Sequence, residues 1–133
     1  MATGSAPPAA HAERPGTPYV DGFVLAVPKD GIDQYEKIAR EAGAVWRDHG
    51  ALSVSECVAD DVPYGELTSF PRAVHATDDE IVVFAWITYE SREARDEINR
   101  KVMADPRMEE LMTHVPVDGK RMIFGGFRTL VNL

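Results

Sequence analysis

The stretch Ile81 to Tyr89 reads IVVFAWITY and is the most apolar run in this chain of 133 residues. Its length and its β-branched content favour a central β-strand over a buried helix segment. Successive side chains of a strand point to opposite faces of the sheet, and here both alternating sets are apolar. Helices that cover one face of the sheet can bury only one set, so the other set needs a second partner.

The residues before this run predict one βαβ half. Tyr19 to Val27 (YVDGFVLAV) predicts a first strand that ends at Pro28, and Asp30 is placed to cap the helix that follows. The apolar residues of that helix recur three and four positions apart, as one buried face requires. They are Ile32, Tyr35, Ile38, Ala39, Ala42, Val45 and Trp46. Gly50 predicts the end of the helix, and Leu52 to Ala59 alternates like a half-buried second strand.

The residues around and after the run complete the fold. Residues 60–69 (DDVPYGELTS) predict a long connection, followed by a short extended piece at 70–74. Ser91 can cap a second helix, and Asp105 with Pro106 can start a third, short one. Arg121 to Leu130 (RMIFGGFRTL) predicts the last strand. The order predicts an α+β fold of ferredoxin-like β-α-β-β-α-β type, with an antiparallel sheet and helices on one face.

Composition limits the classes of function. A formal net charge of -8 argues against a nucleic-acid partner, because phosphate binding depends on clustered Lys and Arg. Cys57 is the single cysteine, which excludes an intrachain disulfide and favours a cytoplasmic protein. No apolar run approaches the ~20 residues of a membrane span. Residues 1–18 are rich in Ala and Pro and predict a flexible tail, so a single domain is expected over residues 19–133.

The doubly apolar run also predicts a homodimer. At ~25 cal/mol per Å² of apolar surface, leaving several hundred Å² of the free sheet face in water would forgo several kcal/mol. That is comparable with the whole stability of a small domain. Pairing of two sheets is the simplest way to bury this face.

Four segments of the chain resemble a known family. They are YVDGF (19–23), GALSVSECVADDVPYGELTSF (50–70), EIVVFAWITYESREARDEINRKVMADPRM (80–108) and DGKRMIFGGF (118–127). Together they are similar to the YbaA-like bacterial proteins, from which the chain departs by its long N-terminal tail and by Glu90 in place of a usual proline. The resemblance implies a ferredoxin-like domain paired as a dimeric α/β barrel and implies no established reaction. The wider superfamily includes cofactor-independent monooxygenases, but a shared fold does not carry function across.

The first strand supplies a candidate site. Its alternating sets are Tyr19, Asp21, Phe23 and Leu25 against Val20, Gly22, Val24 and Ala26. The second set is small and suits close helix packing, so we expect the first set to face the barrel, joined there by Trp86. Asp21 would then either pair with a base such as Arg72 or Arg121, or keep a raised pKa suited to proton transfer.

Two hypotheses of function remain open. The first is a small-ligand-binding protein or cofactor-independent enzyme acting on a small apolar compound, with Asp21 or Glu56 as the catalytic group that moves a proton. Its ligand-binding residues would be Tyr19, Phe23, Phe84, Trp86, Arg121 and Phe124. The alternative is a non-catalytic structural or regulatory homodimer whose barrel is filled by its own side chains. The sequence does not decide whether the protein is an enzyme.

No metal or cofactor is expected from the sequence. The four histidines lie far apart without ligand spacing, and no glycine-rich loop opens a helix as phosphate binding requires. The 60–69 connection is long enough to act as a lid at a barrel mouth, although a plain surface loop explains it equally well.

Overall fold

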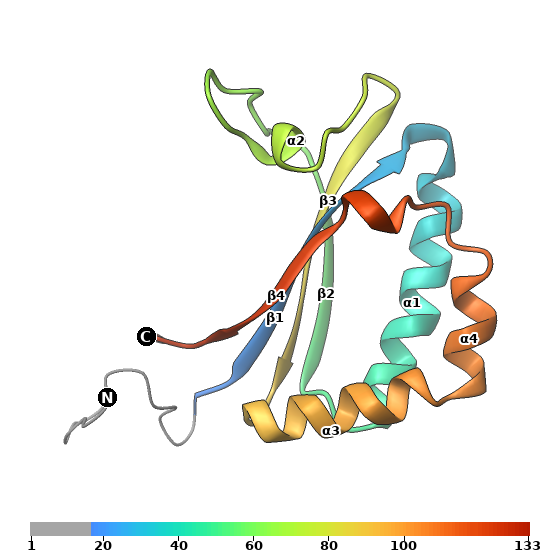
Figure 1. Ribbon diagram of the computed structural model, residues 1–133, viewed down its shortest axis with the longest axis vertical. Coiled ribbons are helices and arrows are strands. Elements are labelled where there is room, and N and C mark those ends of the chain that lie inside the picture. The colour runs from blue at the N-terminus through green and yellow to red at the C-terminus, as the bar shows by residue number, and fades with distance from the viewer. Residues whose placement is uncertain (1–16) are drawn as a thin grey trace.

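The computed structural model describes residues 17–133 and shows one four-stranded antiparallel sheet with helices packed against it (Figure 1). The elements in chain order are β1 (Tyr19–Pro28), η1 (Lys29–Gly31), α1 (Ile32–Asp48), β2 (Ser53–Val58), α2 (Phe70–Ala73), β3 (Glu80–Tyr89), α3 (Arg92–Met103), α4 (Pro106–Met112), η2 (Gly119–Arg121) and β4 (Ile123–Arg128). The tail predicted to be flexible falls almost wholly on residues 1–16, which lie outside the described residues.

The strands follow the order β2-β3-β1-β4, which is the split βαβ arrangement predicted from the sequence. β1 pairs along its whole length with β3, from Tyr19 opposite Tyr89 to Pro28 opposite Glu80. Its other edge pairs with β4. The apolar run that predicted a central strand is therefore an inner strand, held between β1 and β2.

Three helices, α1, α3 and α4, cover one face of the sheet (Figure 1). We call this side the helix face. Most of the strand residues that point to it are large and apolar, and the buried side of α1 packs onto them. Their buried members include Tyr19, Leu25, Val27, Val83, Ile87 and Tyr89 of the strands and Tyr35 and Val45 of α1. The main core of the domain thus lies between the sheet and the helices.

Local side-chain chemistry sets several helix ends. Ser91 Oγ accepts a hydrogen bond from the backbone N–H of Ala94 at 3.0 Å, and Asp105 Oδ1 accepts one from the backbone N–H of Arg107 at 2.9 Å. Both caps were predicted. Asp30, in contrast, lies within η1 and does not cap α1, which begins at Ile32 without a side-chain cap.

The extended piece predicted at residues 70–74 is wrong, because Phe70–Ala73 forms the short helix α2 and Val74 is its C-cap. Ser69 Oγ accepts a hydrogen bond from the backbone N–H of Arg72 at 3.1 Å, and Pro71 occupies the first turn, where its missing N–H has no consequence. A cap followed by proline is a helix-start signal, and it outweighed the apolar character of Phe70 and Val74.

The other side of the sheet has much less cover, and we call it the open face. The segment after α2 buries its upper end, where Val74 packs against Val24, Ala26 and Val82. The remaining open-face residues are Ser53, Ser55 and Cys57 of β2, Phe84, Trp86 and Thr88 of β3, Val20 and Gly22 of β1, and Ile123, Gly125 and Phe127 of β4. Phe84 is 44% exposed and Phe127 is 63% exposed. An aromatic surface therefore lies uncovered within the described part of the chain.

The predicted facing of β1 is wrong. Asp21 and its alternating partners point to the helix face, and the small set with Gly22 points to the open face. Trp86 lies opposite Gly22 and so on the other side of the sheet from Asp21. The physical reason is space: the gap between sheet and helices is filled by the larger set, while the charge of Asp21 is matched from a helix.

Candidate functional site

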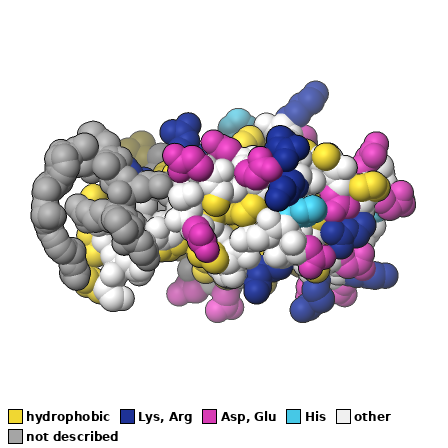
Figure 2. Space-filling view, turned by 90° about the horizontal axis from the view of Figure 1, so that it is seen from below, with side chains coloured by type: hydrophobic (Ala, Val, Ile, Leu, Met, Phe, Trp, Pro, Cys, Tyr) yellow, Lys and Arg dark blue, Asp and Glu magenta, His cyan; other side chains and the backbone are white. Residues whose placement is uncertain are grey.

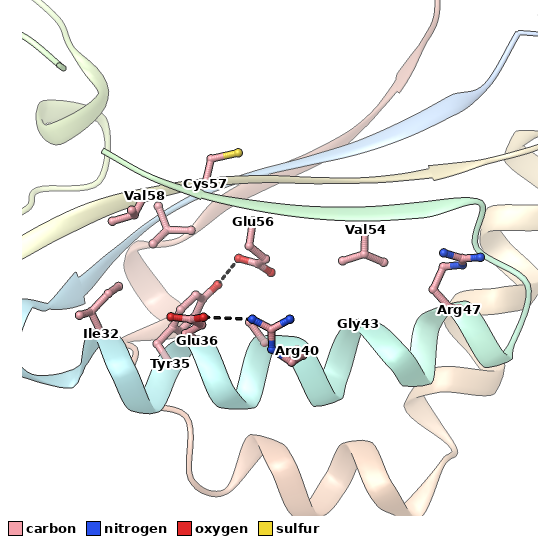
Figure 3. A pocket seen from close by; sticks show the side chains of 12 residues that line it. Ile32, Tyr35, Glu36, Arg40, Gly43, Arg47, Val54, Glu56, Cys57 and Val58 are labelled. Carbon is pink, nitrogen blue, oxygen red and sulfur yellow. Dashed lines mark hydrogen bonds and ion pairs between the residues drawn. The ribbon is translucent and has the colours of Figure 1, made fainter. Parts of the chain in front are cut away.

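A cleft of about 420 Å³ lies between α1 and the edge strand β2 on the helix face (Figure 3). Its lining combines apolar side chains with a small number of charged ones, as ligand sites commonly do. The lining residues are Ile32, Tyr35, Glu36, Ala39, Arg40, Gly43 and Arg47 of α1, Val54, Glu56, Cys57 and Val58 of β2, and Val83 of β3. The side chain of Cys57 points away from α1, toward the open face (Figure 3).

Two small residues of α1, Ala39 and Gly43, face β2 in the cleft. A Cβ atom added to Gly43 would lie 3.3 Å from Cγ1 of Val54, so the helix and the strand approach closely at that point. Glycine in a helix interior costs about 1 kcal/mol relative to alanine. Nearer the start of α1, Ala39 leaves room in front of Glu56 and Val58.

Tyr35 and Glu56 form the central polar contact of the cleft (Figure 3). Tyr35 Oη donates a hydrogen bond to Glu56 Oε1 at 2.6 Å, within the range of short hydrogen bonds to a carboxylate. Glu56 as a whole residue is exposed at the cleft, but the surroundings of its carboxyl group partly desolvate it and raise its pKa, and the hydrogen bond from Tyr35 offsets only part of that rise. Burial and the neighbouring carboxylate also raise the pKa of Tyr35. The phenol therefore stays protonated, and Glu56 holds a proton more strongly than an ordinary glutamate does.

Two guanidinium groups lie farther along the same helix. Arg40 pairs with Glu36 at 3.0 Å, in an exposed pair one helical turn apart. The side chain of Arg47 has no hydrogen-bond or ion-pair partner among residues 17–133. In Figure 3 it lies at the end of the cleft remote from Tyr35, where β2 begins.

Asp21 belongs to a separate buried network. It is 5% exposed, accepts a hydrogen bond from Tyr89 Oη at 3.0 Å, and lies 3.5 Å from a guanidinium nitrogen of Arg95. Arg95 also donates to Tyr19 Oη at 3.2 Å. Burial raises the pKa of Asp21, even though Tyr89 and Arg95 each oppose that rise. Asp21 does not line the cleft. The network braces β1 and β3 against α3.

The base that pairs with Asp21 was predicted wrongly. Arg95 of α3 takes the place expected for Arg72 or Arg121. Arg121 instead lies at the far end of the sheet, 2.7 Å from Glu80 and 3.0 Å from Asp118. Arg72 lies over the ring of Tyr64 at 3.9 Å and binds the backbone of the 60–69 connection. That connection does not line the cleft.

The predicted aromatic wall is divided by the sheet. Phe84 and Trp86 lie together on the open face, with ring centroids 5.4 Å apart. Phe23 and Phe124 stack on the helix face at 6.3 Å. Of the eight residues suggested from the sequence, the structure places only Glu56 in the cleft.

Tyr35 was predicted as a core residue, and its role as the partner of Glu56 was missed. A signal was present in the sequence. Glu56 alternates with Val54 and Val58 on one face of β2, and a buried tyrosine on the facing helix needs a partner for its hydroxyl.

Other classes of site find no support in the described part of the chain. Residues 17–133 contain no cluster of three His, Cys, Asp or Glu side chains that could hold a metal ion. None of the described helices is both long and apolar enough to cross a membrane. Seen from below, acidic and basic side chains are intermixed over the helices and form no basic patch on that face (Figure 2).

The sheet order and its one-sided helices define the chain as an α+β domain of ferredoxin-like type. Solved structures of the same fold include SnoaB, a cofactor-independent oxygenase from Streptomyces nogalater (TM-score 0.56, 14% identity, 86% of this chain and 96% of that one). Another is a dimeric ferredoxin-like protein from an uncultured marine organism (TM-score 0.52, 13% identity, 88% and 100%). At these identities the likeness shows the fold alone.

The chain belongs to the family described as "Protein of unknown function (DUF1428)", whose model matches residues 18–119. The uncharacterized protein YbaA of Escherichia coli K12 is 51% identical over 114 residues, which cover 86% of this chain and 97% of that protein. YbaA of Shigella flexneri matches equally well. The resemblance found in the sequence is confirmed.

Proposed function

We propose that this protein is a homodimeric α/β barrel that binds a small, mainly apolar molecule in the α1–β2 cleft of each subunit. Glu56 would accept a proton from the bound molecule. The observation that carries the proposal is the 2.6 Å contact between Tyr35 Oη and Glu56 Oε1 inside a cleft of about 420 Å³. A carboxylate with a raised pKa, held by a single donor in a pocket, is the usual form of a general base.

The chemistry needs only residues of the chain and the ligand. Tyr35 keeps its proton and orients Glu56 through Oε1. The other oxygen, Oε2, is left to meet the ligand. A weakly acidic C–H or O–H of the ligand gives its proton to Glu56, and the same proton, or one exchanged with water, returns afterwards. The step is a proton transfer and involves no oxidation or reduction.

The dimer part of the proposal rests on the open face. Phe84 and Phe127 are exposed on this face and Trp86 is half-buried beside Phe84, and a second copy would cover these aromatic side chains without any other component. One neighbour of the same fold is described as dimeric. In this arrangement Phe84 and Trp86 serve the interface and Asp21 serves the internal brace. Glu56 alone keeps the catalytic role suggested for it from the sequence.

A blocking variant tests binding in the cleft. Ala39→Phe places a ring inside the cleft, and Ala44→Phe adds the same ring to an exposed position of α1 outside it. A fluorinated fragment set is screened by ¹⁹F NMR against the parent and both variants, with circular dichroism as the check on folding. We expect fragments that bind the parent and Ala44→Phe to lose binding to Ala39→Phe. If the folded parent binds no fragment, the packed homodimer without a ligand becomes the better description.

A second experiment tests the proton transfer. A fragment with an acidic C–H is incubated with the protein in D₂O, and its deuterium content is followed by NMR. We expect the parent to accelerate exchange and Glu56→Gln to remove the acceleration while binding persists. If the parent binds the fragment without accelerating its deuterium exchange, the protein is a carrier or sensor of the ligand rather than a catalyst.

A further inference from the structure

The cleft differs chemically between its two ends. Tyr35 and Glu56 lie toward one end, together with Ile32 and Val58. Arg47 lies at the other end, twelve residues farther along α1, which is about 18 Å at about 1.5 Å of rise per residue. A molecule that fills the cleft therefore meets a proton acceptor at one end and a cation at the other.

The cation at this end is available to a ligand. Arg40 is neutralised by Glu36 at 3.0 Å, whereas the guanidinium of Arg47 has no partner within the described residues. The chain as a whole carries a formal charge of -8, so attraction of an anion has to come from a local group of this kind. A guanidinium fork fits a carboxylate in two parallel hydrogen bonds.

The middle of the cleft is narrow, and the polar group that lines it beside Glu56 is Arg40, which is paired with Glu36 (Figure 3). Gly43 and Val54 face one another there, with Ala39 on the side toward Tyr35. A Cβ at position 43 would already lie 3.3 Å from Val54, so a ligand has to lie beside this contact, and any side chain at position 43 would close the cleft further. A bulky body would be excluded by the same approach of helix and strand.

We propose that the ligand of this cleft is an elongated organic acid. Its carboxylate pairs with Arg47, its apolar body passes Gly43, and its far end reaches Tyr35 and Glu56. This inference rests on the proposed function, because it uses the same cleft. A monoanionic carboxylate fits better than a phosphate ester, since the single free guanidinium of Arg47 would leave one charge of a dianion unmatched in a chain of formal charge -8.

The test uses nonanoate as the probe, with nonan-1-ol as a neutral molecule of similar length and nonyl phosphate as the dianion. Binding to the full chain is measured by isothermal titration calorimetry below the micellar concentrations. We expect nonanoate to bind about tenfold more tightly than the alcohol, which corresponds to a charge-assisted hydrogen bond. Arg47→Gln should abolish that difference. Lys37→Gln removes an exposed cation of the same helix outside the cleft and should preserve it.

Substitution of Gly43 tests the passage. Gly43→Val should weaken nonanoate by at least tenfold and leave butyrate, which does not need to pass Gly43, unchanged. A folded variant that binds nonanoate like the parent contradicts the proposed path.

The outcomes separate this inference from the proposed function. If the alcohol and the acid bind equally and Arg47→Gln changes neither, the acid proposal is wrong and the apolar cleft stands. If nonyl phosphate binds most tightly through Arg47, the ligand is a phosphate ester rather than a carboxylate. If none of the probes binds the parent and the ¹⁹F screen is also empty, both proposals fail.

Discussion

The two faces of the sheet are built from the same strands and have opposite properties. On the helix face, large side chains are buried, and Asp21, the one buried acid among residues 17–133, has its partners within the chain. On the open face, small residues of β1 alternate with exposed aromatic residues of β3 and β4. The comparison separates two tasks: the helix face holds the subunit together, and the open face is suited to joining subunits.

The largest expected effect is loss of the dimer when a charge enters the open face. Phe127→Asp places a carboxylate where two aromatic surfaces would meet, and burying an unpaired charge costs several kcal/mol. We expect light scattering at micromolar concentration to show a dimer for the parent and a monomer for this variant.

Phe124→Asp is the matched control for this prediction. Phe124 is 70% exposed, close to the 63% of Phe127, but it lies on the helix face of the same strand. This variant should remain dimeric. If both variants are dimers, or if the parent itself is a monomer, the open face does not join subunits.

The next effect concerns the helix face. Arg95→Met leaves the carboxylate of Asp21 buried without its cation, so we expect the free energy of unfolding at pH 7 to fall by about 3 kcal/mol. Without Arg95 the pKa of Asp21 rises further, and a raised carboxyl pKa removes stability as pH rises through it. The loss should therefore be smaller at pH 4 than at pH 7, as measured by urea unfolding.

The double variant Asp21→Asn with Arg95→Met provides the control for this brace. It removes both charges, so it should recover part of the loss at pH 7 and show little dependence on pH. If the single variant Arg95→Met is as stable as the parent at both pH values, the Asp21–Arg95 pair contributes nothing to the free energy of unfolding.

A smaller effect is expected at the cleft, near the edge of the helix face. The pKa of Glu56 is raised above 4.5, so the carboxyl stabilises the fold when protonated, and this contribution is lost as pH rises through the folded pKa. Glu56→Gln keeps an acceptor for Tyr35 and cannot ionise. The stability of the parent should fall relative to that of the variant between pH 4.5 and neutral pH. A constant difference across this range would contradict the raised pKa.

The smallest effect compares one helix cap on each side of the sheet. Ser91→Ala removes the cap of α3, a helix of 12 residues in the main core, and should cost about 1 kcal/mol. Ser69→Ala removes the cap of α2, a single turn over the open face, and should cost less because that turn can open locally. Thermal unfolding of both variants gives the comparison. Equal losses would mean that α2 unfolds together with the whole domain.

Sequence patterns predicted the strands and their order better than the faces and the site. Apolar runs and caps act within a few residues, which is why β3 and the helix starts at Ser91 and Asp105 were predicted. Alternation shows which residues of β1 share a face and does not show which face meets the helices. Pairing of Asp21 with Arg95 or of Tyr35 with Glu56 depends on the rotation of a helix above the sheet, which no local pattern contains.

The position of β1 in the sheet has a consequence for synthesis. β1 is the first strand to leave the ribosome, yet it lies between β3 and β4, and β4 ends at Arg128. Both edges of β1 therefore stay unpaired until β3 and β4 have been synthesised. The hydrogen bond from Thr129 Oγ1 to the carbonyl of Pro18 forms later still, when translation of the domain is nearly complete. Long-range pairing of this kind slows folding and leaves strand edges exposed to other nascent chains. During that interval β1 has no completed sheet to protect its two edges.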